Sequence, residues 1–296
     1  MSEQSKLSIV ITGVSTGIGY ATAKLLAERG FQVFGSVRSA ADADRTGRDL
    51  GPNFCPLMFD VTDQPSVNQA ADLVREKLGR NRLFALINNA GVEMAGPLAY
   101  LPVERLRAQL EVNVIGVLAV TQAFLPLIGT EPDRIGSAGR IINISSMLGR
   151  LAVPFVGAYC ASKFGLEGLS DSLRREMMLF GIDVIVVEPG AIVTPIWEKA
   201  EGKLLNEYPN TPYQPSLSKF VETAMKSGRE GFPASRVAEL IERILSTKKP
   251  KARYTLIPKH FVEYTIPRLL PARLLDYLMG KYLGIGAESG EVKGDR

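Results

Sequence analysis

The chain has almost no histidine and little cysteine, and both shortages restrict the chemistry it can perform. His260 is the single histidine in 296 residues, which argues against a histidine-based catalytic triad and against a histidine-ligated zinc site. Cys55 and Cys160 lie in apolar surroundings without metal-binding or redox spacing. We therefore expect reduced, buried thiols and a cytoplasmic protein.

Long apolar runs are also missing from the sequence. No uninterrupted apolar run approaches the ~20 residues that span a bilayer. The first six residues are polar and lead directly into an apolar run, so they do not form a secretory signal.

A strong excess of either charge is absent as well. The net charge is +4, and the positive excess is confined to one stretch, because nine lysines and arginines face two acidic residues between Arg243 and Lys281. An excess this local argues against a protein that binds nucleic acid. It is compatible with contact at a membrane surface near the C-terminus.

Apolar residues make up 46% of the sequence, which is enough to bury a full core. Short apolar runs alternate with stretches that repeat apolar residues at helical spacing. The predicted strands are 7–11, 32–37, 55–59, 83–87, 140–144, 182–187 and 254–257, and the predicted helices are 20–29, 66–78, 103–128 with a break near Pro126, 159–180 and 234–245. This alternation predicts an α/β fold with a doubly wound parallel sheet and right-handed crossovers.

A glycine-rich turn separates the first predicted strand from the first predicted helix. Gly13, Gly17 and Gly19 allow the backbone to approach a pyrophosphate, and the helix N-terminus favours its negative charge. Their spacing departs from the usual Gly-x-Gly-x-x-Gly pattern of dinucleotide-binding proteins. The second strand ends at Arg38 instead of an acidic residue, which favours NADP over NAD because an arginine accommodates the 2′-phosphate.

Tyr159 and Lys163 are four residues apart, so they lie on one face of a predicted helix, where the ammonium favours the ionised phenol. Ser146 lies thirteen residues earlier, at the end of a predicted buried strand, from which its hydroxyl can face the same cleft. Taken alone, the pair is equally compatible with a solvated helix face. Asn113 lies within an apolar helix and is expected to have a buried partner, with a satisfied core asparagine as the alternative.

We divide the chain into one catalytic domain, residues 1–258, and two C-terminal segments. Residues 191–233 within the domain are too long and mixed for an ordinary connection and are predicted to form a substrate lid. Residues 259–283 are aromatic and basic and are expected to cover the protein's own surface, with a membrane surface or a partner subunit as alternatives. Residues 284–296 are polar and are expected to be disordered.

The chain resembles the short-chain dehydrogenase/reductase family through motifs that occur in the family's order. These motifs are Thr12-Gly13-(x)3-Gly17-Ile18-Gly19, Asp60, Asn88-Asn89-Ala90-Gly91, Asn113, Ser146, Tyr159-(x)3-Lys163 and Pro189-Gly190. The resemblance implies an NAD(P)-dependent oxidoreductase with a Rossmann-type, three-layer αβα fold of about seven strands, a lid and a C-terminal helical extension. It also implies a homodimer or homotetramer packed through the helices that bear Asn113 and Tyr159.

The resemblance assigns roles to individual residues. Tyr159 would be the general acid in reduction and the base in oxidation, Lys163 would lower its pKa and hold the nicotinamide ribose, and Ser146, with Ser145 as its rival, would bond the substrate oxygen. Asn113 would hold a water that links Lys163 to solvent. The residues implied to bind NADP(H), with NAD(H) as the alternative, are Gly13, Ser15, Gly17, Ile18, Gly19, Arg38, Asp60, Val61, Asn89, Ala90, Gly91, Tyr159, Lys163, Pro189, Gly190, Ile192 and Thr194.

The expected reaction is hydride transfer between nicotinamide and a carbonyl or alcohol of a bulky apolar substrate. The C-terminal texture is similar to that of the hydroxysteroid and retinol dehydrogenase branches, which favours a steroid, a retinoid or a similar ketone. Reduction of 3-oxoacyl groups or other aliphatic ketones is the alternative within the family. A dinucleotide sensor without turnover is the alternative of a different class, although a sensor has no need of Tyr159, Lys163 and Ser146.

Overall fold

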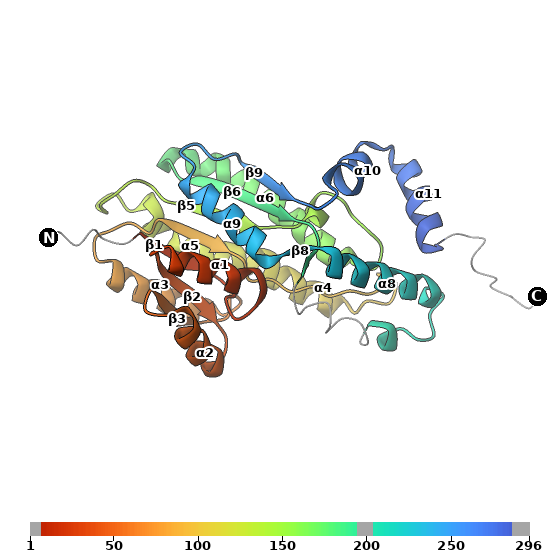
Figure 1. The fold of residues 1–296 in the computed structure, drawn as a ribbon, viewed down its shortest axis with the longest axis horizontal. Helices are drawn as coiled ribbons and strands as arrows, with labels where there is room; N and C mark the ends of the chain where they lie inside the picture. The colour runs from red at the N-terminus through yellow and green to blue at the C-terminus, as the bar shows by residue number, and fades with distance from the viewer. Residues whose placement is uncertain (1–6, 194–203, 286–296) are drawn as a thin grey trace, which may run out of the picture.

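The computed structural model describes residues 7–193 and 204–285. A central sheet of seven parallel strands has the order β3-β2-β1-β4-β5-β6-β9 (Figure 1). The strands are β1 (Ser8–Ile11), β2 (Gln32–Val37), β3 (Phe54–Met58), β4 (Ala85–Asn88), β5 (Arg140–Ile144), β6 (Asp183–Pro189) and β9 (Arg253–Leu256). The predicted parallel, doubly wound sheet of seven strands is confirmed.

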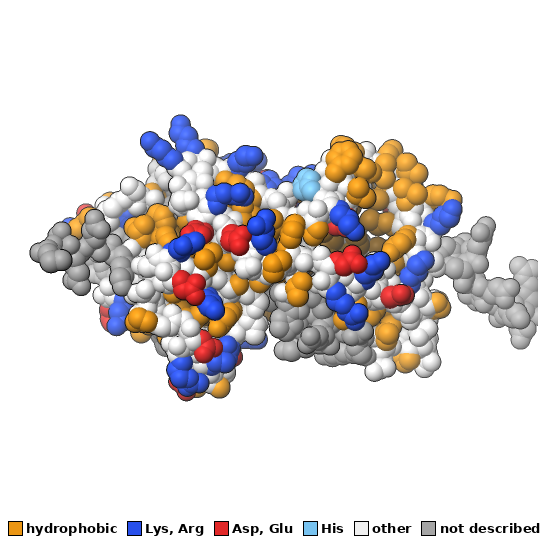
Figure 2. All heavy atoms as spheres, in the orientation of Figure 1, with side chains coloured by type: hydrophobic (Ala, Val, Ile, Leu, Met, Phe, Trp, Pro, Cys, Tyr) orange, Lys and Arg blue, Asp and Glu red, His pale blue; other side chains and the backbone are white. Residues whose placement is uncertain are grey.

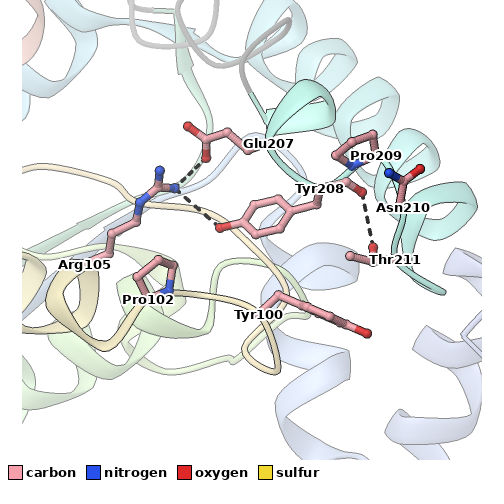
Figure 3. Close-up of a pocket in the computed structure, with 8 residues that line it drawn as sticks. All are labelled: Tyr100, Pro102, Arg105, Glu207, Tyr208, Pro209, Asn210 and Thr211. Carbon is pink, nitrogen blue, oxygen red and sulfur yellow. Dashed lines mark hydrogen bonds and ion pairs between the residues drawn. The ribbon is translucent and has the colours of Figure 1, made fainter.

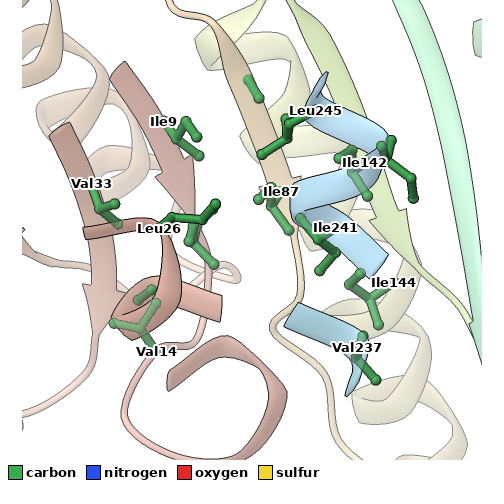
Figure 4. Close-up of a cluster of buried hydrophobic side chains, with 14 of the residues drawn as sticks. Ile9, Val14, Leu26, Val33, Ile87, Ile142, Ile144, Val237, Ile241 and Leu245 are labelled. Carbon is green, nitrogen blue, oxygen red and sulfur yellow. The ribbon is translucent and has the colours of Figure 1, made fainter. Parts of the chain in front are cut away.

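Helices cover both faces of this sheet. The helices that pack on it are α1 (Gly17–Glu28), α2 (Ala40–Leu50), α3 (Gln64–Leu78), α5 (Gly116–Leu125), α6 (Gly157–Glu176) and α9 (Ala234–Ser246). Helix α4 (Val103–Leu110) packs against α6, and α8 (Gln214–Glu230), α10 (Ile266–Leu269) and α11 (Ala272–Leu283) lie beside the sheet (Figure 1). On one face, Leu26 of α1 and Ile241 of α9 pack on Ile9 and Ile142 of the strands (Figure 4). On the other face, Val74 of α3 and Phe124 of α5 belong to a second core cluster.

The predicted helix 103–128 continues past Pro126, where the sequence predicted a break. It contains two π-helical turns, Glu111–Ile115 and Pro126–Thr130, and the helical backbone is lost only at Gly129. By length and composition the run 103–130 could cross a membrane. Its inward side chains, among them Val120 and Phe124, are fully buried against the sheet, so it serves as a core helix.

The predicted lid 191–233 is more regular than its mixed composition indicated. It contains β7 (Ile192–Val193), the 17-residue helix α8 and β8 (Phe232–Pro233), and β7 pairs with β8 in a small second sheet. Leu217, Val221 and Met225 of α8 repeat every four residues and are buried, a helical signal that the sequence does contain. Residues 194–203, which include the implied cofactor residue Thr194, lie outside the described residues.

The described part of the lid is attached to the start of α4. Arg105 Nη1 lies 2.5 Å from the Glu207 carboxylate and 3.4 Å from the Tyr208 hydroxyl (Figure 3). A cavity of about 410 Å³ opens beside this contact, lined by Tyr100 and Asn210 among others. None of the residues assigned to catalysis or cofactor binding lines it, so this cavity is separate from the catalytic cleft.

The C-terminal extension is helical, as expected, but it buries little of its apolar surface. Tyr264 and Leu283 are buried, and Leu283 joins the cluster under α8. The apolar side chains that remain exposed are Phe261, Val262, Ile266, Leu269, Leu274, Tyr277, Leu278 and Tyr282, and apolar atoms gather over α10 and α11 in Figure 2. Pro267 and Pro271 divide the segment into short helices. Besides the two buried residues, Tyr282 contacts Thr223 and Lys219 of α8, so the segment covers the protein's own surface only in part.

Candidate active site

The glycine turn after β1 has a backbone that only glycine adopts easily. Gly13 and Gly17 have φ angles of +71° and +62°, and a Cβ atom on Gly19 would lie 2.2 Å from the Gly13 carbonyl oxygen. The first turn of α1 holds no acidic residue, and the side chain of Thr16 does not cap it. The amide groups at this helix end are therefore oriented to receive an anion.

Two side chains fix this turn against the end of β4. The Thr12 hydroxyl accepts hydrogen bonds of 2.9 Å from the backbone N–H groups of Asn89 and Ala90. The Asn89 side chain in turn donates to the carbonyl oxygens of Thr12 and Gly13, at 2.9 and 3.0 Å. Asn89, which the resemblance implied as a cofactor-binding residue, thus shapes the cofactor cleft by holding the glycine turn.

A cavity of about 350 Å³ extends from the glycine turn along the ends of β2, β3 and β4. It is lined by Gly13, Ser15, Gly17, Ile18, Arg38, Asp60, Val61, Asn89, Ala90 and Gly91, together with Thr16, Ser36, Val37, Phe59, Val92 and Val112. Arg38 is 74% exposed at its mouth, with Nη1 3.7 Å from the Asp60 carboxylate. The residues assigned to the pyrophosphate and adenosine end are therefore together, and the glycine cradle fits a dinucleotide.

Another cavity, of about 160 Å³, contains three of the four predicted catalytic side chains, and Asn113 does not line it. Ser146, Tyr159 and Lys163 line it, together with Pro189, Gly190, Ile192, Ile18, Gly91, Asn89, Val92, Glu93, Ile144 and Ser145. The dinucleotide cavity of about 350 Å³ shares four lining residues with it, Ile18, Asn89, Gly91 and Val92, so the two cavities are adjacent. The Ser146 hydroxyl accepts from the Leu148 N–H at 3.1 Å, whereas the buried Ser145 hydroxyl has no hydrogen-bond partner among the described residues.

The phenol of Tyr159 is held in its protonated form. Burial raises the pKa of Tyr159 well above its usual value, and the negative charge of Glu93 raises it further. A hydrogen bond with Ser146 opposes part of this rise. Tyr159 is therefore set up to donate a proton at neutral pH, the form that reduction of a carbonyl requires.

Lys163 is buried beside Tyr159. Its ammonium donates to the Ile144 carbonyl oxygen at 2.9 Å and lies 5.6 Å from the centre of the Tyr159 ring. Burial lowers the pKa of Lys163 to about 8, although the carboxylates of Glu167 and Glu93 raise it. Burial is the largest cause of both shifts, and the lowering of the Tyr159 pKa by Lys163 stays a prediction.

The low pKa of Lys163 predicts a specific pH dependence of stability. Between pH 8 and the usual pKa of 10.5 the folded chain has lost the Lys163 proton while the unfolded chain retains it, so folding becomes more favourable as pH rises. Relative to Lys163→Met, we expect the unfolding free energy of the wild type to increase by about 2 kcal/mol from pH 7 to pH 9.5. Urea unfolding at both pH values measures this difference, with Lys77→Met, at an exposed position of α3, as the control. Equal pH dependence in all three proteins would contradict it.

Asn113 has the buried partners that the sequence required, and they occupy its whole amide. Its Nδ2 donates to the Val92 carbonyl oxygen at 2.9 Å and to the Ser162 hydroxyl at 3.0 Å, and its Oδ1 accepts from the Val92 N–H at 2.9 Å. The alternative of a satisfied core asparagine is therefore correct for the side chain. Because the side chain is already bonded, the water that Asn113 is expected to bind would contact its backbone, within the π-helical turn.

Gln109 and Glu93 are two residues of the site that the sequence motifs do not include. Gln109 is fully buried one helical turn before Asn113; its Nε2 donates to the Val92 carbonyl oxygen and its Oε1 accepts from the Met94 N–H at 2.7 Å. A glutamine four residues before a buried asparagine on an apolar helix is a signal that could have been used. Glu93 follows Asn88-Asn89-Ala90-Gly91 closely, but nothing in the sequence shows that its side chain enters the cavity.

The C-terminal extension is connected to the end of β6, next to Pro189 and Gly190. The Tyr264 hydroxyl donates to the fully buried carboxylate of Glu188 at 2.7 Å. Arg253 Nε lies 2.8 Å from the other oxygen of Glu188. The strand end that carries Pro189 and Gly190 into the catalytic cavity is thereby fixed from two sides.

Known proteins resemble this chain over most of its length. Residues 8–204 match the family described as short chain dehydrogenase. The NADPH-dependent 3-dehydrocapnine reductase of Ornithobacterium rhinotracheale is 38% identical over 93% of this chain and 96% of the relative. Retinol dehydrogenase 5 of Mus musculus is 33% identical over 95% of this chain and 90% of the relative.

Another relative and a solved structure are also similar to this chain. The 3-amino-tetrahydro-pyrrolizinone reductase of Xenorhabdus hominickii is 42% identical over 66% of this chain and 65% of the relative. A crystal structure of an actinorhodin polyketide ketoreductase variant with NADPH superposes with a TM-score of 0.72 and 28% identity, over 86% of this chain and 97% of that chain. The predicted family resemblance, including its retinol dehydrogenase branch, and the Rossmann-type fold are confirmed.

Proposed function

Because the chain belongs to the short chain dehydrogenase family, we propose that it transfers a hydride between NADP(H) and the carbonyl or alcohol carbon of a bulky apolar substrate. The observation that carries the proposal is the joint placement of Ser146, Tyr159 and Lys163 around one cavity that adjoins the dinucleotide cleft. The raised pKa of Tyr159 suits its role as proton donor when a carbonyl is reduced.

The cofactor would lie along the carboxyl ends of the strands. The glycine turn and the α1 N-terminus would hold its pyrophosphate, Arg38 its 2′-phosphate, and Asp60 with Val61 its adenine. Lys163 would hold the nicotinamide ribose, with Pro189, Gly190 and Ile192 beside the nicotinamide. When bound, NADPH supplies the hydride that reduces the carbonyl carbon.

Two hydroxyl groups of the chain would act on the substrate oxygen. Ser146 donates a hydrogen bond to it, and Tyr159 donates the proton that converts the developing alkoxide into an alcohol. Both groups are already fixed around the cavity, so they stabilise the charge that appears in the transition state more than the neutral carbonyl. Loss of the proton from Tyr159 leaves a phenolate. The protonated ammonium of Lys163 can stabilise this phenolate.

The cavity walls favour an apolar substrate. Ile18, Val92, Ile144 and Ile192 line the space around Tyr159. The relatives are named for varied substrates, among them retinol and an amino-substituted pyrrolizinone, so the names alone leave the substrate class open between retinoid-like, steroid-like and aliphatic ketones. Reduction of 3-oxoacyl groups is the alternative that the same cavity allows.

A homodimer or homotetramer formed through the helices that bear Asn113 and Tyr159 stays a prediction. Two large apolar side chains on these helices are exposed: Ile115, two residues after Asn113, by 51%, and Phe164 of α6 by 45%. Their exposure on these helices supports the same interface. Contact of the exposed apolar and basic C-terminal extension with a membrane surface is the remaining prediction for partners.

A titration followed by a substrate panel tests the proposed function. We expect NADPH to bind more tightly than NADH, as measured by fluorescence of the nicotinamide, and one class among steroid, retinoid and aliphatic ketones to be reduced. Tight NADPH binding without turnover on any class would instead favour the dinucleotide sensor. Failure of both cofactors to bind would contradict the proposal entirely.

A further inference from the structure

Glu93 is an acidic side chain in the catalytic cavity that has no role in the proposed hydride transfer. It lies on the loop between β4 and α4 and lines the cavity together with Ser146, Tyr159 and Lys163. The residue is half-buried. Within residues 7–193 and 204–285 its carboxylate makes no hydrogen bond and no ion pair, and the cation that acts on it is the Lys163 ammonium.

The backbone on both sides of Glu93 is fixed. Asn113 binds both the N–H and the carbonyl oxygen of Val92, and Gln109 binds the same carbonyl oxygen and the N–H of Met94. Gln109 is fully buried and Asn113 is 1% exposed, one turn apart on the helix that packs behind the loop. The loop is therefore held in one conformation, which presents the Glu93 side chain to the cavity at little further cost in entropy.

The charges of Glu93 and Lys163 act on each other in the cavity, but the two side chains form no ion pair. Lys163 is the only lysine or arginine among the lining residues, and its ammonium is bonded to the Ile144 carbonyl oxygen. Burial raises the pKa of the Glu93 carboxyl, with Lys163 opposing the rise, which shows that the surroundings solvate the carboxylate poorly. Ile18, Val92, Ile144 and Ile192 supply these apolar surroundings, where a charge is stable only with a partner.

Glu93 does not assist the proton transfer either. Its negative charge raises the pKa of Tyr159 and therefore opposes formation of the phenolate. A cation bound beside Glu93 would remove this opposition and would fill the missing ion pair. Lys163 is the one lysine or arginine among the described lining residues and does not pair with Glu93, so the substrate is the source of such a cation in this inference.

We propose that Glu93 is a specificity-determining residue that binds the ammonium group of an amino ketone, next to the carbonyl held by Ser146 and Tyr159. The proposal rests on the proposed ketone reductase activity and names its substrate class. Because Glu93, Ser146 and Tyr159 line one cavity of about 160 Å³, the amine and the carbonyl are on adjacent or nearly adjacent carbons.

Three matched ketones test the proposal: dodecan-3-one, 2-aminododecan-3-one and 2-hydroxydodecan-3-one, each reduced with NADPH. We expect the wild type to prefer the amino ketone in kcat/KM, and Glu93→Gln to lose on the order of 30-fold or more for the amino ketone alone. Glutamine retains the shape and hydrogen-bonding capacity of the side chain but removes its charge. Glu104→Gln, at a side chain 76% exposed on α4, is the control that should match the wild type on all three ketones.

The other outcomes each overturn the proposal. Equal losses on all three ketones in Glu93→Gln would assign Glu93 to proton transfer or folding, and a preference for the hydroxy ketone would assign it to a neutral hydrogen-bond donor. Turnover of dodecan-3-one without a preference for the amine would overturn this inference and leave the reductase activity intact. Absence of turnover on all three ketones would also overturn it, and the proposed function would fail as well only if NADPH did not bind.

Discussion

Tyr159→Phe is expected to lower kcat by about 10³-fold while leaving the affinity for NADPH unchanged. The substitution removes the one proton donor that burial holds protonated in the catalytic cavity, and it retains the aromatic ring that packs there. Ser146 would still polarise the carbonyl, so residual turnover reflects hydrogen bonding without proton donation. Steady-state kinetics and a fluorescence titration with NADPH measure the two quantities on the same protein.

The control for this variant is Tyr277→Phe, which removes a hydroxyl from a side chain 62% exposed on α11. It should retain the kinetics of the wild type. Turnover of Tyr159→Phe within tenfold of the wild type would show that another group or water donates the proton. Loss of NADPH binding along with turnover would show that Tyr159 shapes the cofactor site and would leave its acid role unsupported.

Arg38→Asp is expected to shift the ratio of the NADPH and NADH affinities by about 10²-fold toward NADH. Arg38 is a cation at the end of β2 and lines the dinucleotide cleft, where its guanidinium can pair with a 2′-phosphate. Aspartate in its place repels the phosphate and can accept a hydrogen bond from a ribose 2′-hydroxyl. The affinities are measured by nicotinamide fluorescence.

Arg48→Asp makes the same change of charge at an exposed position of α2 that does not line the cleft, and it should leave the ratio unaltered. Arg45, the other arginine near the glycine turn, already donates to the Ser15 carbonyl oxygen at 2.7 Å and pairs with Asp42 at 2.7 Å. If the ratio of the NADPH and NADH affinities is unchanged in Arg38→Asp, a neighbouring residue such as Arg45 binds the 2′-phosphate instead.

The central sheet could be predicted from the sequence because its strands are short apolar runs, buried on both faces. Helix α2 could not be, since only Thr46 and Leu50 of it are buried and most of its length is polar. Helix α8 has a regular apolar repeat, but the prolines and glycines around it directed the interpretation toward an irregular lid. Helix α8 is stabilised by residues distant in the sequence, among them Phe155 and Leu283, whereas α2 packs on its neighbours β2 and β3.

The candidate site divides in the same way. The glycine turn, Ser146, Tyr159 and Lys163 lie at strand ends or on a helix face, so their spacing placed them in one cleft. The roles of Thr12, Gln109 and Glu93 depend on bonds across turns that no spacing reveals. The pKa values of Tyr159 and Lys163 depend on burial, which the motif alone does not show.

The most direct test of the hydride transfer uses NADPH that carries deuterium at the transferable position of the nicotinamide C4. The product alcohol formed from a ketone that the panel identifies is examined by mass spectrometry, with Tyr159→Phe treated in parallel. We predict one deuterium on the carbinol carbon of the wild-type product and almost no product from the variant. Binding of the labelled NADPH without transfer of deuterium to any ketone would contradict the assignment of this chain as a reductase.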